Sequence, residues 1–220
     1  VSAHGRVIIL APLAVGPQLE TEASKWGVSA TYVRDDSAEH RIVITNYEML
    51  AHFDASAFVG VVLDESSILK SYDGKTKDRL MKAFGRTPYR LACTATPAPN
   101  DFTELGNHSE FLGLKSRVEM LAEYFVHDGG STKDWRIKGH AVTPFWRWVA
   151  TWGAVVKMPS DLGYDDGGFA LPPLEMVEHV VPSTDHDVRA SGQLFAMEAR
   201  TLQEQRLVRR GTIGSRVKRT

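Results

Sequence analysis

Two short apolar stretches that each end abruptly in polar side chains place the strongest constraint on the fold of this chain. The first covers 59–63 and is followed at once by Asp64 and Glu65. Because its residues are apolar throughout rather than alternating with polar ones, the pattern is typical of a strand buried on both faces of a parallel sheet. The second stretch begins at Leu91 and ends in Thr94, Ala95, Thr96 and Pro97. If these strands are neighbours, the hydroxyls of the second meet the carboxylates of the first.

The acidic pair indicates a ligand site. Carboxylates at the carboxyl end of a parallel strand lie in the crevice where open α/β sheets bind ligands. At such a place Asp64 can hold Mg²⁺ on the phosphates of a nucleotide, and Glu65 can orient or deprotonate an attacking water.

Together the two stretches resemble the Asp-Glu-x-x box (motif II, or Walker B) and motif III of superfamily 2 helicases and translocases. The closest likeness is to the Swi/Snf-type branch and to helicase-like proteins of phages and prophages. The resemblance implies that Asp64 and Glu65 are catalytic and bind the cofactors ATP and Mg²⁺, with Asp64 as the metal ligand. It also implies that Thr94 and Thr96 sense the nucleotide state and link it to the DNA site. Ser66 and Ser67 stand where relatives often carry Ala-His or Gly-His, so the replacement for that His is left open.

A turn near the start of the chain resembles motif Ia of the same family, which touches the DNA backbone. Residues 6–11 predict a buried strand, and Gly16 and Pro17 open a helix that Gly27 ends. The resemblance implies DNA contacts from Pro12 and Gln18. From the residues alone, an ordinary strand–turn–helix explains the pattern equally well.

A second turn resembles motif Ib. Residues 41–45 predict the next strand, and a short helix begins at Asn46 and Tyr47. The resemblance implies that both residues present polar groups to DNA phosphates, which helix N-termini attract. The residues alone favour Asn46 as a helix cap.

The tripeptide Gly74, Lys75 and Thr76 does not form a phosphate-binding P-loop. That motif needs another glycine five residues before Gly74, where Leu69 stands, and it should precede the acidic strand rather than follow it. We therefore expect Lys75 to begin a helix with Leu80, Met81 and Phe84 on its apolar face. Since the family carries its P-loop just before the strand that 6–11 resembles, we expect this sequence to begin after it. Loss of the P-loop in a non-catalytic protein is the alternative.

The middle of the chain predicts further helices. Residues 116–126 predict a helix whose apolar face carries Val118, Leu121, Ala122 and Phe125, and 133–141 predict a small hairpin or an extended insertion. The segment 145–152 holds three of the five tryptophans. Their spacing favours a helix that packs a core over aromatic rings that stack on nucleobases.

The end of the chain is basic. Residues 174–181 predict a strand, and the pattern from 185 onward is helical. Between 200 and 220 there are seven Arg or Lys and one acid, Glu204. Such a segment binds nucleic-acid phosphates or forms a solvated linker helix.

Composition narrows the remaining choices. A 220-residue chain with 43% hydrophobic and 24% charged residues is typical of a globular protein. The net charge of −1 means that any nucleic-acid site comes from local patches. The single cysteine, Cys93, excludes an intrachain disulfide and a multi-cysteine zinc site, and we expect it in the core. No apolar run approaches the roughly 18 residues of a membrane span, and no signal peptide is evident, which indicates a cytoplasmic protein without membrane contacts.

Taken together, the sequence predicts an α/β fold: a RecA-like P-loop NTPase lobe with a mainly parallel sheet flanked by helices and a helical C-terminal extension. We expect a partial ATP-binding lobe without motif I at 1–115, completion of the lobe with a Trp-rich helical insertion at 116–181, and a basic helical linker at 182–220. The resemblance implies an ATP-dependent helicase or translocase that hydrolyses ATP and moves on double-stranded DNA, with a second RecA-like lobe of the same protein as its partner. Residues 1–220 by themselves are expected to be inactive. The alternative is a non-catalytic DNA-binding or scaffolding module.

Overall fold

A computed structural model of the chain describes residues 5–37, 39–70, 74–127, 135–169, 171–177, 201–211 and 213–217. The chain divides into two compact units, Val1–Ala154 and Val155–Thr220. Among the described residues, no helix combines the length and the apolar character needed to cross a membrane.

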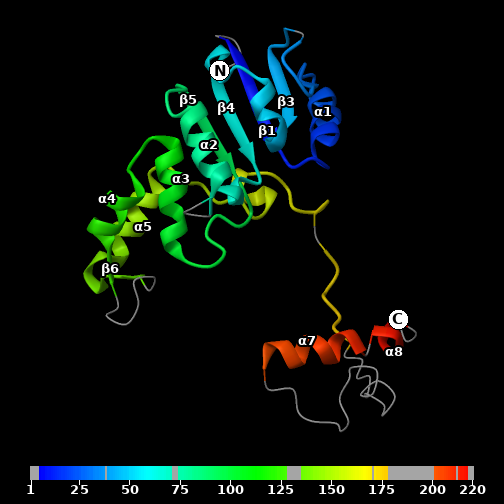
Figure 1. The fold of residues 1–220 in the computed structure, drawn as a ribbon, viewed down its shortest axis with the longest axis vertical. Coiled ribbons are helices and arrows are strands. Elements are labelled where there is room, and N and C mark those ends of the chain that lie inside the picture. The colour runs from blue at the N-terminus through cyan, green and yellow to red at the C-terminus, as the bar shows by residue number, and fades with distance from the viewer. Residues whose placement is uncertain are drawn as a thin grey trace. The chain divides into compact units, whose positions relative to one another are not determined.

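The first unit is built on a five-stranded sheet in which all strands run parallel (Figure 1). The strand order is β2-β3-β1-β4-β5. The strands are β1 (Arg6–Ala11), β2 (Thr31–Tyr32), β3 (Ile42–Asn46), β4 (Phe58–Asp64) and β5 (Tyr89–Cys93). An α/β fold with a parallel sheet flanked by helices is therefore confirmed. The expected pairing of the two polar-ended strands is also present, since β4 and β5 are neighbours and Asp64 lies opposite Cys93.

Three helices flank this sheet, α1 (Gly16–Lys25), α2 (Lys75–Phe84) and α3 (Leu105–Leu112). As predicted, α2 begins at Lys75, and its residues Leu80 and Phe84 are fully buried. They pack in one core with alternate residues of the central strands, which point to the same face of the sheet. These core residues are Ile8, Leu10, Val61, Leu63 and, from α3, Phe111.

The turn before α1 depends on Gly16. A side chain at this position would collide with the ring of Tyr32, because a Cβ would lie 2.3 Å from its Cε2 atom. The helix ends as predicted at Gly27, whose φ of +67° is the left-handed conformation that glycine adopts without strain.

Short 3-10 helices connect these elements. They are η2 (Tyr47–His52), η3 (Ala55–Ala57), η4 (Ser66–Lys70), η5 (Phe102–Glu104) and η6 (Gly139–Ala141). The helix predicted to begin at Asn46 and Tyr47 is thus a 3-10 helix, and the acidic pair is followed directly by η4.

The edge strand β5 is less buried than its apolar sequence suggests. Tyr89 and Leu91 are 50% and 53% exposed, and Cys93 is exposed as well. These three residues alternate along the strand and so share one face. The prediction that Cys93 is a core residue is wrong, because a strand at the edge of a sheet buries less of its surface than a central one.

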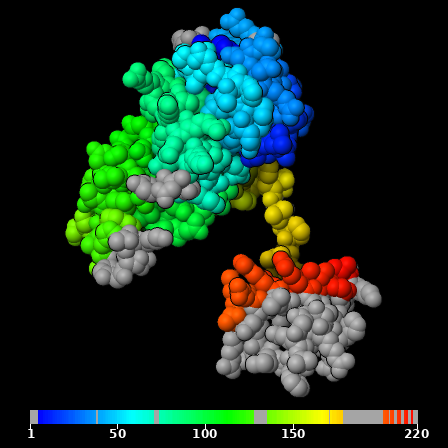
Figure 2. All heavy atoms as spheres, viewed as in Figure 1, coloured from blue at the N-terminus to red at the C-terminus, as the bar shows by residue number. Residues whose placement is uncertain are grey.

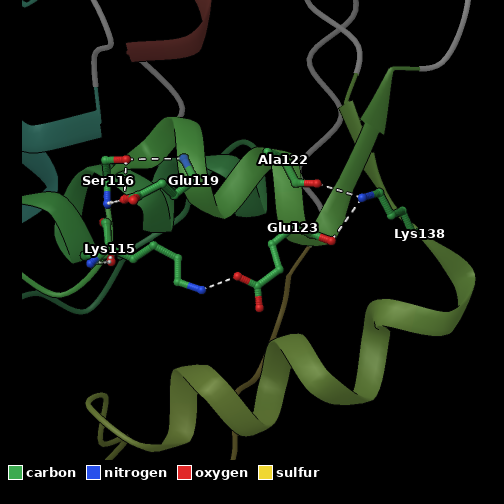
Figure 3. A network of polar contacts seen from close by, with 7 residues as sticks. Lys115, Ser116, Glu119, Ala122, Glu123 and Lys138 are labelled. Atoms are coloured by element: carbon green, nitrogen blue, oxygen red, sulfur yellow. Dashed lines mark hydrogen bonds and ion pairs between the residues drawn. The ribbon is translucent and has the colours of Figure 1, made fainter.

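Helix α4 (Arg117–Tyr124) is held at both of its ends (Figure 3). At its start, Ser116 and Glu119 form a capping box. At its end, the ammonium group of Lys138 donates to the carbonyls of Ala122 and Glu123, at 2.7 and 3.0 Å. Lys115 also pairs with the carboxylate of Glu123.

The predicted helix 116–126 therefore ends two residues too late. The backbone becomes extended at Phe125, which begins β6 (Phe125–His127), and β6 pairs antiparallel with β7 (Trp135–Ile137). The hairpin predicted within 133–141 is therefore confirmed only for its strand 135–137, because the partner strand lies at 125–127 and residues 139–141 form η6. Val118 and Ala122, both predicted on the apolar face, are exposed, Val118 at 68%, and Met120 and Tyr124 are buried instead.

Helix α5 (Val142–Ala150) carries the tryptophan-rich segment. Phe145 is fully buried and its ring packs edge-on against Tyr124 and Phe125, while Trp148 stacks on Tyr124. The core-packing interpretation is confirmed for these rings. Because α3 contacts α4 as well as α2 and β5, the helical part and the sheet form one continuous body in Figure 2.

The second unit contains η7 (Pro159–Leu162), α7 (Leu202–Gly211) and α8 (Ile213–Val217). Residues 174–177 have no regular structure, so the strand predicted at 174–181 is wrong over this part. The rest of that strand and the helix predicted over 185–200 lie outside the described residues.

Candidate functional site

The polar segments predicted from the sequence meet at one edge of the sheet. Since the strands run parallel, the residues that end or follow them lie at the carboxyl-terminal edge. Pro12 follows β1, Asn46 ends β3, Asp64 ends β4 and Thr94 follows β5. The register places Ala11 beside Asn46 and Asp64 beside Cys93.

Glu65 has an unusual backbone conformation. Its φ of +51° makes it the one non-glycine residue with positive φ in the described part of the chain. For a residue with a side chain, the left-handed region costs roughly 1–2 kcal/mol. Strain of this kind collects at functional sites and persists only where surrounding contacts hold it. The Glu65 side chain itself is exposed.

Asp64 lies beside Glu65 in a half-buried position. Burial raises the pKa of Asp64, and the negative charge of Glu65 raises it further. A bound cation would relieve both effects, because it replaces lost hydration and neutralises the two carboxylates.

Thr94 lies within hydrogen-bonding distance of Glu65. Its hydroxyl donates to Oε2 of Glu65 at 3.3 Å, which confirms the expected meeting of hydroxyl and carboxylate. The backbone N–H of Thr96 donates to the Thr94 hydroxyl at 3.0 Å and so orients it, and a role of Thr96 in sensing the nucleotide stays a prediction.

Tyr47 is turned inward. It is 6% exposed, and its hydroxyl donates to the backbone carbonyl of Asp64 at 2.6 Å. Burial raises the pKa of Tyr47 well above its usual value, and the charges of Asp64 and Glu65 add to the effect. Tyr47 therefore fixes the backbone at Asp64 from the buried side of the sheet edge.

Asn46 is also buried, at 3% exposure. Its amide donates to Glu48 at 2.7 Å, and Tyr32 donates to its carbonyl oxygen at 3.4 Å. Asn46 occupies the N-cap position of η2 as predicted, but its side chain makes no capping hydrogen bond. Among the four residues predicted to contact DNA, Gln18 is exposed and Pro12 is half-buried, with its carbonyl closing a turn to Val15 at 2.9 Å. DNA contact by any of them stays a prediction.

Two buried residues of α3 complete the site and were missed from the sequence. Nε2 of His108 lies 3.2 Å from the hydroxyl of Ser66, and Asn107 donates to the backbone carbonyls of Leu69 and Lys70. A signal was available, because Asn107 and His108 are polar residues between Leu105 and Phe111 on a helix too apolar to be fully solvated. Nothing local indicates which partners they reach.

The oxygen atoms at this edge suit a magnesium-bound nucleotide. Mg²⁺ prefers one or two carboxylates together with substrate phosphates rather than a complete protein cage. Asp64 and Glu65 supply two carboxylates, and in the described part of the chain no cluster of three or more His, Cys, Asp or Glu forms a protein-only metal site. Asp64 is the ligand that the geometry favours, since Glu65 is engaged by Thr94.

A separate groove of about 460 Å³ lies away from the acidic pair. It opens along the amino-terminal part of β4 and β5, and its lining is mostly apolar, including Val62, Leu91, Leu114 and Trp152. It contains none of the carboxylates described above.

Comparison with known proteins adds no assignment, since no family model and no curated protein matches the chain. What the fold and the site define is a class: an α/β protein with a five-stranded parallel sheet whose carboxyl edge carries two adjacent acids, Asp64 and the strained Glu65.

Proposed function

We propose that the first unit is a RecA-like lobe of an ATP-dependent DNA translocase or helicase. In this proposal, ATP hydrolysis at the carboxyl edge of the sheet drives movement on double-stranded DNA. The observation that supports it most is the contact between Thr94 and the strained Glu65, beside Asp64. Backbone strain at an exposed carboxylate that hydrogen-bonds to the residue following the neighbouring strand is typical of a functional site.

Each residue of the edge has a distinct role in this proposal. Asp64 would hold Mg²⁺, which would supply positive charge to neutralise the phosphate oxygens. Glu65 orients the attacking water and accepts its proton. Thr94 contacts Glu65 and thereby links the nucleotide state of the site to the loop that follows β5. The order of these residues in the sequence, and their resemblance to motifs II and III, favour this assignment over a generic ligand site.

The proposed partners are double-stranded DNA and a second RecA-like lobe of the same protein. The loops at the carboxyl edge present the DNA surface, with Gln18 at the start of α1 as its exposed polar side chain. Contacts of this kind bind the phosphate backbone without regard to sequence.

The test is ATP hydrolysis by the full-length protein that contains this chain, measured with and without double-stranded DNA. Glu65→Gln keeps the shape of the side chain but removes the base, so hydrolysis should fall by about two orders of magnitude or more. Glu175→Gln is the matched control, because Glu175 is exposed and lies in the other unit, and it should hydrolyse ATP at the wild-type rate.

Two results would overturn the proposal. One is wild-type protein that binds DNA and does not hydrolyse ATP, which would favour the scaffolding alternative. The other is hydrolysis that is equally fast in the Glu65→Gln variant.

A further inference from the structure

We infer that α3 sets the position of Glu65, with His108 and Asn107 as positioning residues for the general base. The inference rests on the proposed function, because it concerns how the base of that reaction is held. It assigns a role to two buried side chains that do not contact Asp64 or Glu65. Neither residue belongs to the two stretches that resemble motifs II and III.

The starting point is the strain at Glu65. A left-handed conformation at a glutamate relaxes unless the residues before and after it are fixed. On the side before Glu65, the Tyr47 hydroxyl holds the carbonyl of Asp64 at 2.6 Å. On the side after it, the first residue is Ser66, which is fully buried although its side chain is polar.

His108 provides the anchor for Ser66. The 3.2 Å contact joins Nε2 to the Ser66 hydroxyl across 42 residues of sequence, and His108 is itself 4% exposed. Burial lowers the pKa of His108, so the ring is neutral near pH 7 and one nitrogen accepts while the other donates. Nδ1 is buried and makes no hydrogen bond within the described residues, so the tautomer decides whether the Ser66 hydroxyl donates to Nε2 or accepts from it.

Asn107 provides a second anchor at the other end of η4, three to four residues after Ser66. Its Nδ2 donates to the carbonyls of Leu69 and Lys70 at 2.8 and 3.2 Å, which end η4. Its Oδ1 accepts from Lys77 at 3.1 Å. Since every polar atom of this amide is used, its orientation is determined.

Lys77 connects the network to α2. It is buried, and it also pairs with Glu110 of α3 at 3.4 Å. The segment 66–70 is therefore held at its beginning and at its end by neighbouring residues of α3, and α3 is locked to α2 by a charge pair.

The same helix is joined to the loop that carries Thr94. This loop runs through Asn100, whose side chain donates to Glu104 at 2.7 Å, and Asp101, whose carboxylate accepts from the N–H of Thr103 at 2.6 Å. Thr103 and Glu104 lie in η5, which leads directly into α3 at Leu105, and α3 in turn contacts η4. A displacement of α3 moves both groups that meet at Glu65.

The experiment compares His108→Leu and Ser66→Ala, singly and together, in the full-length protein. His108→Leu removes the hydrogen bond and keeps the site apolar, and Ser66→Ala removes the same bond from the other side. His140→Leu is the matched control, because His140 is exposed and lies far along the chain in η6. A fifth variant, His108→Gln, restores a polar side chain that can form a hydrogen bond with Ser66.

Two readouts separate positioning from stability. The first is amide hydrogen exchange of peptides covering 65–70, which should become at least about tenfold faster in both single variants and stay unchanged in peptides of β1. The second is steady-state ATP hydrolysis. A misplaced base lowers kcat by about tenfold to a hundredfold, while KM for ATP stays within about twofold. The kcat of the double variant should be no lower than that of the slower single variant, because the two substitutions remove the same contact. His108→Gln should recover most of kcat.

The outcomes decide between this inference and the proposed function. Unchanged exchange over 65–70, or faster exchange with normal kcat, overturns the positioning role. An equal rise in KM and fall in kcat also overturns it, since that indicates general damage to the site. If wild-type protein hydrolyses no ATP, the proposed function fails, and with it the role of α3 in catalysis; the exchange data then show whether the anchoring itself exists.

Discussion

At residue 65, backbone conformation and side-chain chemistry have opposite requirements. The left-handed φ of +51° suits glycine, whereas the contact with Thr94 requires a carboxylate. A glutamate at this position costs stability and is retained only where its side chain is needed. The strain is therefore independent support for a functional role of Glu65.

Because of this strain, we predict that Glu65→Gly is more stable than Glu65→Ala, the reverse of the usual order. Both Glu65→Gly and Glu65→Ala remove the side chain, so they differ mainly in backbone preference. At ordinary positions glycine is less stable than alanine, but at positive φ it should be more stable by about 1 kcal/mol. Urea unfolding measures the difference. An alanine variant that is as stable as the glycine variant would contradict the strained conformation.

His108 predicts how stability depends on pH. Burial lowers the pKa of His108, although Glu104 and Ser66 oppose the shift. The unfolded chain binds a proton there near pH 6.5, the usual histidine value, while the folded chain does not. Because the unfolded state binds more protons, stability is lost as the pH falls below about 6.5.

The variant His108→Gln isolates this effect. The free energy of unfolding should fall more between pH 7 and about 5.5 in the wild type than in the variant. The raised pKa of Asp64 affects the pH dependence of stability in the opposite direction and at more acidic pH. Because Asp64 is present in both proteins, its contribution cancels in the comparison. Parallel pH profiles would show that His108 is not held neutral by the fold.

At the scale of elements, Phe145 and Trp148 of α5 pack in a core, whereas Trp146 is 42% exposed. The ring of Phe145 contacts Tyr124, Phe125, Trp146 and Trp148. Phe145→Ala should therefore destabilise the protein by about 3–5 kcal/mol. Val118→Ala, at an exposed position of the adjacent helix α4, should change stability by less than about 0.5 kcal/mol. Chemical denaturation distinguishes them, and a small effect of Phe145→Ala would contradict the packing.

Local patterns were sufficient for several elements and not for others. The apolar runs that became β1 and β4, and the helix at Lys75, follow from residues adjacent in sequence. The exposure of Cys93 does not, because it depends on β5 lying at the sheet edge. The early end of α4 involves distant residues, because β6 begins at Phe125 and pairs with β7, and Lys138, which follows β7, donates to the last carbonyls of the helix.

The candidate site divides in the same way. Asp64, Glu65 and Thr94 were predictable because the carboxyl ends of adjacent parallel strands always meet at one edge. The inward turn of Tyr47 and the contact of His108 with Ser66 were not, since these partners are 17 and 42 residues apart. Sequence order alone does not indicate which side chain faces which.

At the scale of the whole molecule, the net charge of −1 conceals a basic segment in the second unit. Arg206, Arg209 and Arg210 are exposed on α7. If the protein binds duplex DNA as proposed, affinity should fall steeply between low and physiological salt, because binding releases counterions. Deleting 200–220 should reduce this salt dependence and leave weaker binding by the first unit. Binding that is abolished by the deletion would assign the DNA surface to the basic segment instead.

The central claim is that Asp64 and Glu65 have different tasks in one reaction, and nucleotide binding tests it most directly. Affinity for Mg²⁺–ATP is measured in the full-length protein for the wild type, Asp64→Ala and Glu65→Gln, together with the rate of hydrolysis. Glu65→Gln should bind ATP nearly as well as the wild type and hydrolyse it about a hundredfold or more slowly. Asp64→Ala should weaken the magnesium-dependent part of binding itself. Equal loss of binding in both variants, or normal binding in both, would contradict the account.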